Sequence, residues 1–328
     1  MKQNDTPTMK DVAREAGVSL GTVSKVINGI PVGEHYRKRV EEATKKLGYQ
    51  VNDYARGLKT NKTNCVALVM PSLRHPFFAT LVDELTAALA RCGYRCMLML
   101  TNYDSEVEQR SFTMAKQNKI DGVIALTYSP NLEVDDSLPI VTIDRHLGTN
   151  LPCVSSDNFW GGVTAARKLI ELGCKKLLFL RIGAEIEGEA EKRGPGFENA
   201  CRAANVPYHS ILLRDGDTEE PFYRFLEEHI LNGQLEYDGI FCNSDGLAER
   251  VCSFLRDQDI RIPEDVQIIG YDGIVHYATG RFGCSTIVQP IPEMAEAAVK
   301  YLLQNQGELT PTNITLPVYY APGGTTRD

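Results

Sequence analysis

The sequence predicts a small all-α headpiece followed by a large α/β module of two lobes with parallel, doubly wound sheets. Two observations carry this prediction. Residues 1–50 contain short capped helical patterns and no strand pattern. From residue 65 onward, apolar strand-like runs alternate with helical patterns, as in parallel sheets covered by helices. We therefore expect a headpiece at 1–50, a hinge and linker at 51–63 and the module at 64–328.

Three helices are expected in the headpiece: one that runs through 11–16, one at 20–27 and one at 34–47. The residues that mark their ends are the N-caps Thr8 (with Asp11 completing a capping box) and Ser19, and the terminators Gly17, Asn28, Gly29 and Gly48. Two helices joined by a tight Gly-containing turn and followed by a third form the helix-turn-helix arrangement.

The second of these helices has two faces at about 100° per residue. Its apolar face can pack on the first helix. Its other face offers a glycine, hydroxyls, a cation and an amide, which suit the major groove of DNA, where Lys25 can donate to guanine. The candidate DNA contacts are Ser19, Leu20, Gly21, Thr22, Ser24, Lys25 and Asn28. For this helix alone, an ordinary solvated face is an equal alternative.

Charge is divided unevenly along the chain, whose formal net charge is −8. Residues 1–62 contain 12 Lys/Arg and 7 Asp/Glu, a net +5, and the remainder contains 23 basic and 36 acidic residues, a net −13. A basic segment on an acidic body is typical of a nucleic-acid-binding protein in which only the basic part approaches phosphate.

Strand and helix patterns alternate through the large module. Strands are expected at 65–70, 96–100, 121–126, 176–180, 238–242 and 266–271, and helices at 77–91, 106–118, 162–172, 198–204, 219–231 and 246–257. Segments 119–124 and 236–241 echo each other, because each follows a helix and enters a strand through Asp-Gly. The echo indicates two similar lobes, as in periplasmic binding proteins, that close on a ligand at the carboxyl ends of their strands.

The headpiece resembles that of the LacI/GalR family of regulators. The segments that carry the resemblance are Lys10-Asp11-Val12-Ala13, Ala16-Gly17-Val18-Ser19, Thr22-Val23-Ser24 and Val26-Ile27-Asn28-Gly29. The resemblance implies that Leu20, Gly21 and Lys25 read bases. Leu20 and Gly21 depart from the longer polar pair often present there, which leaves the operator sequence open.

Residues 51–63 are expected to form one or two helical turns, too few to be stable alone. This segment is similar to the family's hinge helix, which orders on DNA against its dimer mate. The resemblance implies that Leu58 is a wedge in the minor groove, with Ala55, Arg56 and Lys59 as neighbouring contacts. Without the adjacent headpiece, an ordinary linker leucine would be the better interpretation.

The family pattern also covers the large module, with one lobe expected at about 64–159 and 290–316 and the other at about 160–289 and 317–328. It implies effector contacts by Phe77, Phe78, Asp144, Arg145, Arg193, Ser244, Asp245 and Asp272. The aromatic pair could stack on a ligand, and the charged groups could bond its hydroxyls. Asp157 and Asp245 could instead be helix caps, and Phe77 could belong to the core.

One departure from the family concerns the ligand. Many relatives carry an aromatic residue after a Gly-Asp pair in the second lobe, where it stacks on the ligand. Here Thr218 follows that pair. Either the ligand lacks a flat apolar face, or Phe222 or Tyr223 takes the place of the missing ring.

A solute-binding protein and an enzyme are the competing interpretations. The first would need a signal peptide and no headpiece, whereas the N-terminus here is polar and no apolar run is long enough to span a bilayer. For the second, residues 17–21 match G-x-S-x-G, but that motif needs a preceding strand. The chain has no P-loop or zinc pattern, and its six histidines are scattered. Its nine cysteines form no C-x-x-C pair and are expected to be reduced and in the core.

The sequence thus predicts a cytoplasmic, ligand-responsive regulator, expected to be a repressor, without a cofactor, a metal or catalytic activity. It is expected to bind a pseudopalindromic double-stranded DNA operator as a homodimer, because two-fold protein symmetry matches two half-sites. No membrane association is expected. The resemblance implies a small-molecule effector between the lobes, usually a sugar in this family.

Overall fold

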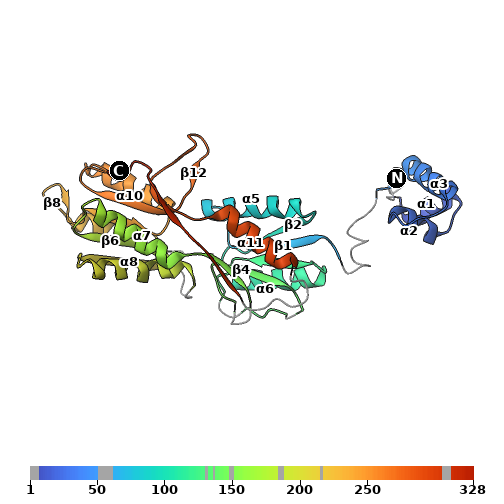
Figure 1. Cartoon of the computed structure of the whole chain (residues 1–328), viewed down its shortest axis with the longest axis horizontal. Coiled ribbons are helices and arrows are strands. Elements are labelled where there is room, and N and C mark those ends of the chain that lie inside the picture. The colour runs from blue at the N-terminus through green and yellow to red at the C-terminus, as the bar shows by residue number, and fades with distance from the viewer. Residues whose placement is uncertain are drawn as a thin grey trace. The chain divides into compact units, whose positions relative to one another are not determined.

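The computed structural model describes residues 7–50, 62–129, 132–135, 137–147, 151–183, 188–214, 217–304 and 312–328. The chain forms two compact units, Met1–Thr63 and Asn64–Asp328 (Figure 1). Within the described residues, no helix is both long and apolar enough to cross a membrane.

The small unit contains the three predicted helices, α1 (Met9–Ala16), α2 (Leu20–Ile27) and α3 (Glu34–Leu47). The capping box is confirmed, because the Thr8 side chain accepts from the backbone of Asp11 while the Asp11 carboxylate accepts from that of Thr8. Gly17 and Gly48 end their helices in the left-handed conformation that glycine adopts without strain.

A small core joins these helices. Its buried residues are Val12, Ala13 and Ala16 of α1, Val23 of α2, and Val40 and Ala43 of α3. Val26 and Ile27 pack against it while remaining partly exposed. The apolar arc of α2 is therefore used for packing, as predicted, and the opposite arc is free to face a partner.

The first lobe of the large unit is a parallel six-stranded sheet in the order β15-β5-β4-β3-β1-β2. Its strands are β1 (Cys65–Met70), β2 (Arg95–Leu100), β3 (Gly122–Ala125), β4 (Ile140–Ile143), β5 (Cys153–Ser156) and β15 (Asn313–Leu316). Helices α5 (Pro76–Arg91) and α11 (Ile291–Gln304) share one hydrophobic cluster with the sheet, and α6 (Ser105–Gln117) belongs to the cluster on the other face.

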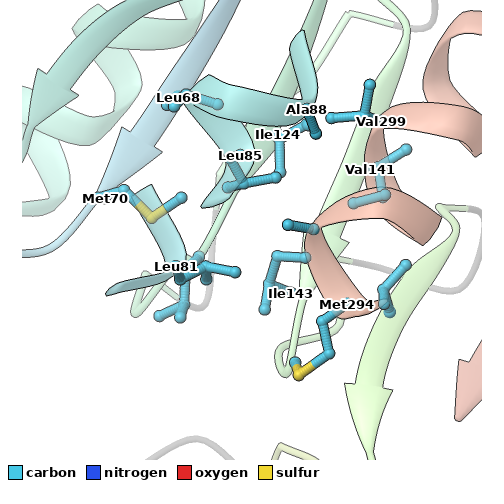
Figure 2. Packing of buried hydrophobic residues seen from close by; sticks show 14 of the residues in the cluster. Leu68, Met70, Leu81, Leu85, Ala88, Ile124, Val141, Ile143, Met294 and Val299 are labelled. Atoms are coloured by element: carbon cyan, nitrogen blue, oxygen red, sulfur yellow. The ribbon is translucent and has the colours of Figure 1, made fainter. Parts of the chain in front are cut away.

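Figure 2 shows the larger of these two clusters. Leu85 of α5 lies beside Ile124 of β3, and Leu81 of α5, Val141 of β4 and Met294 of α11 belong to the same cluster. Burial of each such side chain stabilises the fold by about 1.5–3 kcal/mol. Helix α11 therefore belongs to the first lobe although it follows, in sequence, every second-lobe strand except the last.

The second lobe is a six-stranded sheet in the order β16-β14-β11-β10-β6-β7, in which only β16 is antiparallel. Its strands are β6 (Leu177–Gly183), β7 (Tyr208–Arg214), β10 (Gly239–Cys242), β11 (Gln267–Asp272), β14 (Ser285–Val288) and β16 (Tyr319–Ala321). Helices α7 (Asn158–Glu171) and α8 (Arg193–Ala203) cover one face, and α9 (Glu220–Glu228) and α10 (Asp245–Asp257) cover the other.

Two glycines let α7 and α8 pack closely. A side chain at Gly162 of α7 would come within 2.0 Å of the Arg193 carbonyl oxygen, and one at Gly196 of α8 within 2.0 Å of the Phe159 carbonyl oxygen. Figure 1 shows the two helices lying side by side along their length. The contact fixes the start of α8, and with it the position of Arg193, against α7.

Several predicted boundaries were wrong. Helix α8 begins at Arg193 rather than 198, because its Gly- and Pro-containing first turn is a poor helix former that the contact with α7 stabilises. Helix α9 ends at Glu228 rather than 231, since Ile230–Leu231 pair with Gln234–Leu235 as the short strands β8 and β9. All nine cysteines are free, but Cys92 is exposed rather than in the core and Cys96 is only half-buried.

Candidate functional site

A cavity of about 800 Å³ lies between the two lobes. Its walls come from residues that follow the carboxyl ends of parallel strands in both lobes, among them Phe77 after β1, Asp144 after β4, Ser244 after β10 and Asp272 at the end of β11. Parallel strands end at one edge of a sheet, and two such edges facing each other form the usual ligand site of this architecture.

Arg193 is fixed on the floor of the cavity. Its Nε donates to Asn158 Oδ1 at 2.7 Å, and its Nη1 donates to the Asn243 carbonyl at 2.6 Å. The guanidinium carbon lies 3.6 Å from the centre of the Tyr271 ring. These contacts orient a buried cation without neutralising it, so it can bond oxygen atoms of a ligand.

Two buried carboxyl groups flank this cation. Asp272 Oδ1 accepts from Gln289 Nε2 at 2.7 Å, while Oδ2 is buried and has no hydrogen-bond partner in the described part of the chain. Burial raises the pKa of Asp144 to about 6, against the opposing charges of Arg193 and Arg145. Burial also raises the pKa of Asp272, which Arg193 and the Gln289 hydrogen bond oppose. Carboxyl groups held this way can both donate to and accept from ligand hydroxyls.

An ion pair and a side-chain hydrogen bond cross between the lobes at the rim of the cavity. Arg145 of the first lobe lies 3.0 Å from Glu191 of the second, and His146 Nε2 lies 2.7 Å from Glu189 Oε1. The Glu189 backbone N–H donates to the Asp144 carbonyl at 2.9 Å. Burial raises the pKa of Glu189, but the hydrogen bonds from Lys192 and His146 outweigh burial and hold it below its ordinary value.

The structure gathers most of the predicted effector contacts at this cavity. Seven of them line it: Phe77, Phe78, Asp144, Arg145, Arg193, Ser244 and Asp272. The two phenylalanines also belong to the first-lobe core, so the core interpretation of Phe77 holds beside the ligand one. Ser244 both lines the cavity and caps α10, by accepting from the Leu247 N–H at 3.3 Å.

Asp245 does not line the cavity. Its Oδ1 accepts from Thr286 Oγ1 at 2.6 Å, and its Oδ2 accepts from the Ile274 N–H at 2.8 Å. Burial raises its pKa, and the charge of Asp272 adds to the effect. Asp245 is therefore an internal tie that holds the segment after β11, and not the cap of α10. Asp157, the other acid considered as a helix cap, does cap α7, because its side chain accepts from the Trp160 N–H at 3.1 Å.

Neither proposed substitute for the missing aromatic residue reaches the cavity. Phe222 is fully buried in the core beneath α9, and the Tyr223 hydroxyl donates to Glu219 at 2.7 Å. The half-exposed Leu212 of β7 lines the cavity in that part of the lobe. The prediction that Phe222 or Tyr223 takes the place of the missing aromatic ring is therefore wrong.

Other lining or supporting residues were missed. Asn158 directly follows Asp157, a residue that the sequence analysis had considered, and Gln289 carried no such signal, yet each holds a cavity side chain in place. Asn243 precedes a predicted contact and supplies a carbonyl. No local pattern marked Arg181, which lies in the middle of a strand.

The predicted DNA-facing surface is the outer arc of α2. Leu20, Gly21 and Lys25 are exposed there, and Lys25 has no partner among the described residues. Ser19 caps the helix by accepting from the Thr22 N–H at 3.1 Å, and Asn28 Nδ2 donates to the Ser24 carbonyl at 2.7 Å. The four predicted hinge contacts, Ala55, Arg56, Leu58 and Lys59, lie outside the described residues.

Two family models match the chain. Residues 63–315 match periplasmic binding proteins and the sugar binding domain of the LacI family, and residues 8–52 match the bacterial regulatory proteins of the lacI family. The chain is 32% identical over 322 residues to the sucrose operon repressor of Streptococcus mutans, which covers 94% of this chain and 96% of that protein.

Solved structures are also similar to this chain. The chain is similar to a complex of the transcriptional regulator CelR with cellobiose, with a TM-score of 0.67 and 26% identity over 97% of this chain and 99% of that one. It is also similar in fold to a lac repressor dimer bound to operator and the anti-inducer ONPF, with a TM-score of 0.81 and 20% identity over 98% of this chain and 99% of that one.

Proposed function

This chain belongs to the LacI family of bacterial regulatory proteins, and from that premise we propose that it is a repressor whose affinity for DNA is set by a sugar bound between its lobes. The observation that carries the proposal is the presence, in one chain, of an exposed cationic helix face and a cavity whose floor holds an oriented arginine between two buried acids. The first suits DNA, and the second suits a ligand with several hydroxyl groups.

The DNA contact is proposed to lie along α2. Lys25 can donate to guanine O6 and N7 in the major groove, while Leu20 and Gly21 let the helix approach base edges closely. Ser19, Thr22, Ser24 and Asn28 are left for phosphates and nearby base edges. If each headpiece neutralises roughly three or four phosphates, log K falls with log salt concentration at a slope of about −5 to −7 for the dimer.

The hinge contacts remain proposals from sequence. Leu58 from each chain would be inserted into the minor groove at the centre of the operator, with Ala55, Arg56 and Lys59 beside it. Effector binding would change the angle between the lobes and so the spacing of the two hinges. A coupling free energy of about 1–3 kcal/mol is enough for such a switch.

A homodimer is proposed because the first-lobe sheet ends in an apolar edge. Strand β2 is the edge strand, and its Leu98 and Leu100 are each more than a third exposed. An exposed apolar edge of this kind is normally covered by a partner. Two-fold pairing of two chains would present two headpieces to the two half-sites of a pseudopalindrome.

Selection from a pool of random DNA duplexes tests the proposal as a whole. The full chain is expected to enrich a palindrome. A mixture of sugars is expected to change the fraction of that palindrome bound by about tenfold or more. The sign of that shift distinguishes an inducer from a corepressor. No enrichment with or without sugars would contradict the proposal and favour a solute-binding role for the large unit.

We propose that the ligand is a signal and not a substrate. We also propose that the protein acts in the bacterial cytoplasm, where the DNA is. The family is one of transcriptional regulators. The bound sugar should therefore be recovered unchanged after prolonged incubation with the protein, as followed by chromatography. Turnover of the bound sugar would overturn this part of the proposal.

A further inference from the structure

Most charged side chains around the cavity are already paired. The pairs are Arg145 with Glu191, Lys192 with Glu189, Arg250 with Glu219, and Glu198 with Arg202. Among the described residues Arg193 has no ion-pair partner, but its hydrogen bonds to Asn158 and Asn243 and its contact with Tyr271 fix its guanidinium between two acids.

Arg181 of β6 is different. It lines the cavity, and in the described part of the chain it has neither a hydrogen-bond nor an ion-pair partner. Its Nε is buried without a partner, and its guanidinium carbon lies 5.9 Å from the centre of the Phe179 ring. A cation that loses part of its hydration without gaining a partner costs free energy, which a bound anion would offset.

The local structure makes room for this guanidinium. A side chain at Gly194 would come within 2.8 Å of Arg181 Nη1, so the glycine at the start of α8 is what lets the arginine lie there. On the adjacent strand, Leu212 is paired in register with Arg181 and supplies an apolar wall to the cavity. A planar cation held between an apolar wall and a glycine presents its remaining donors to the cavity.

We propose that the effector carries an anionic group, a phosphate or a carboxylate, which Arg181 binds, while the acids beside Arg193 bind the hydroxyl groups of its sugar body. This inference rests on the proposed function, since it assumes that the effector occupies the cavity between the lobes. The two ends of the ligand are distinguished by charge. Asp144 and Asp272 would repel an anion and accept from hydroxyls, whereas Arg181 has donors and no acceptor.

Matched pairs of ligands test the assignment. Binding of glucose, fructose and ribose to the full chain is measured by titration calorimetry, and each sugar is compared with its terminal monophosphate. Gluconate and glucuronate, each compared with glucose, serve as the carboxylate arm. For at least one sugar we expect the anionic form to bind about tenfold or more tightly than the neutral form, as a charge-assisted hydrogen bond implies. The arm that gains most identifies phosphate or carboxylate as the group.

Variants of the full chain test whether Arg181 is the source of the preference for the anionic ligand. Arg181→Gln is expected to bring the ratio of anionic to neutral affinity to about one, and Arg181→Lys is expected to keep part of the ratio. Arg224→Gln is the control, since it removes one positive charge from the exposed surface of α9 and does not line the cavity. Its ratio should equal that of the parent.

Failure of the anionic assignment can be distinguished from failure of the proposed function. If a neutral sugar binds as tightly as its anionic form and changes DNA affinity, the proposed function stands and the anionic assignment is overturned. The same holds if Arg181→Gln leaves the ratio unchanged. If no probe of either class binds, the sugar effector and the anionic group are both contradicted, and DNA selection without effector still tests the regulator on its own.

Discussion

His146 of the first lobe lies 2.7 Å from Glu189 of the second, imidazole Nε2 to carboxylate Oε1, at the rim of the cavity. Beside it the Glu189 backbone donates to the Asp144 carbonyl. Glu189 of the second lobe thus contacts the first lobe twice, at the rim through His146 and at the cavity wall through Asp144. Because Glu189 contacts the first lobe only when the lobes are together, the pair favours the closed arrangement.

Removing the imidazole should loosen that closure. His146→Ala is expected to lower effector affinity by about twofold to tenfold, as expected for the loss of one partly buried hydrogen bond to a charged group. Titration calorimetry with the effector measures it. His229→Ala is the matched control, because its imidazole pairs with Glu236 at 3.8 Å within the second lobe alone. Equal losses in both variants would show that the rim pair has no special role in closure.

The buried acid Asp144 should make stability depend on pH in a defined direction. Its folded pKa of about 6 is raised above the ordinary 3.8, so the stability it contributes is complete below about pH 4 and is lost as pH rises through 6. Asp144→Asn does not titrate. The free energy of unfolding of this variant, relative to the parent, should therefore increase by about 3 kcal/mol between about pH 4 and pH 8.

Urea unfolding without effector at a series of pH values measures this difference. Asp259→Asn is the control, because Asp259 has the same left-handed backbone, with φ 59° against 53° for Asp144, but is exposed. A pH-dependent rise in the Asp144→Asn difference no larger than that of Asp259→Asn would contradict the raised pKa of Asp144.

Lys25 should determine which bases are read. Lys25→Ala is expected to weaken operator binding by about 1–3 kcal/mol and to relax base preference at one position of each half-site. Selection followed by fluorescence anisotropy on single-base operator variants measures both effects. Lys300→Ala removes the same charge from the exposed surface of α11 and should change neither. A uniform loss over all sequences would indicate a phosphate contact instead.

Leu58 lies outside the described residues, and its role as a wedge stays a prediction from sequence. Leu58→Ala is expected to weaken specific binding on the order of tenfold or more, while non-specific binding, which rests on phosphate contacts, changes little. Gel-shift titrations on operator and on scrambled DNA compare the two. Loss of both affinities by the same factor would argue against insertion between base pairs.

The apolar edge of β2 should govern assembly. Replacing Leu98 and Leu100 together by Lys is expected to raise the dimer dissociation constant at least about tenfold, because charge is placed on a surface that a partner would bury. Sedimentation velocity over a range of concentrations measures it. Leu231→Lys is the control, since Leu231 is 61% exposed in the short ladder of β8 and β9. An unchanged dimer in the double variant would place the interface elsewhere.

The strongest sequence signals predicted the fold well. Helices α2 and α3 have the predicted bounds, because caps and glycines mark both of their ends in the sequence. Strand β1 was equally clear, being a six-residue apolar run that is buried on both faces. By contrast, β4, β5 and β14 are four-residue strands without the Asp-Gly entry that marked the equally short β3 and β10, and β7 has exposed positions on both faces, so no pattern separated them from loops.

The cavity was predictable only where family landmarks covered it. Asp144, Arg193 and Asp272 were located through their motifs, but Asp245 has a similar motif signal and turns inward to Thr286. Which way a carboxylate faces depends on tertiary contacts that sequence spacing does not encode. Arg181 was missed for the same reason, since its position opposite Gly194 depends on the packing of α8 against β6.

The return of the chain to the first lobe has a consequence for synthesis on the ribosome. The headpiece emerges early and has its own core, so it can fold while the rest is being made. The first lobe, in contrast, lacks α11 and β15 until residues 291–316 have emerged, and until then the part of its hydrophobic cluster that α11 covers is open to water. The nascent first lobe must therefore wait, with its apolar surface open to chaperones, until all of the second lobe except β16 has been translated.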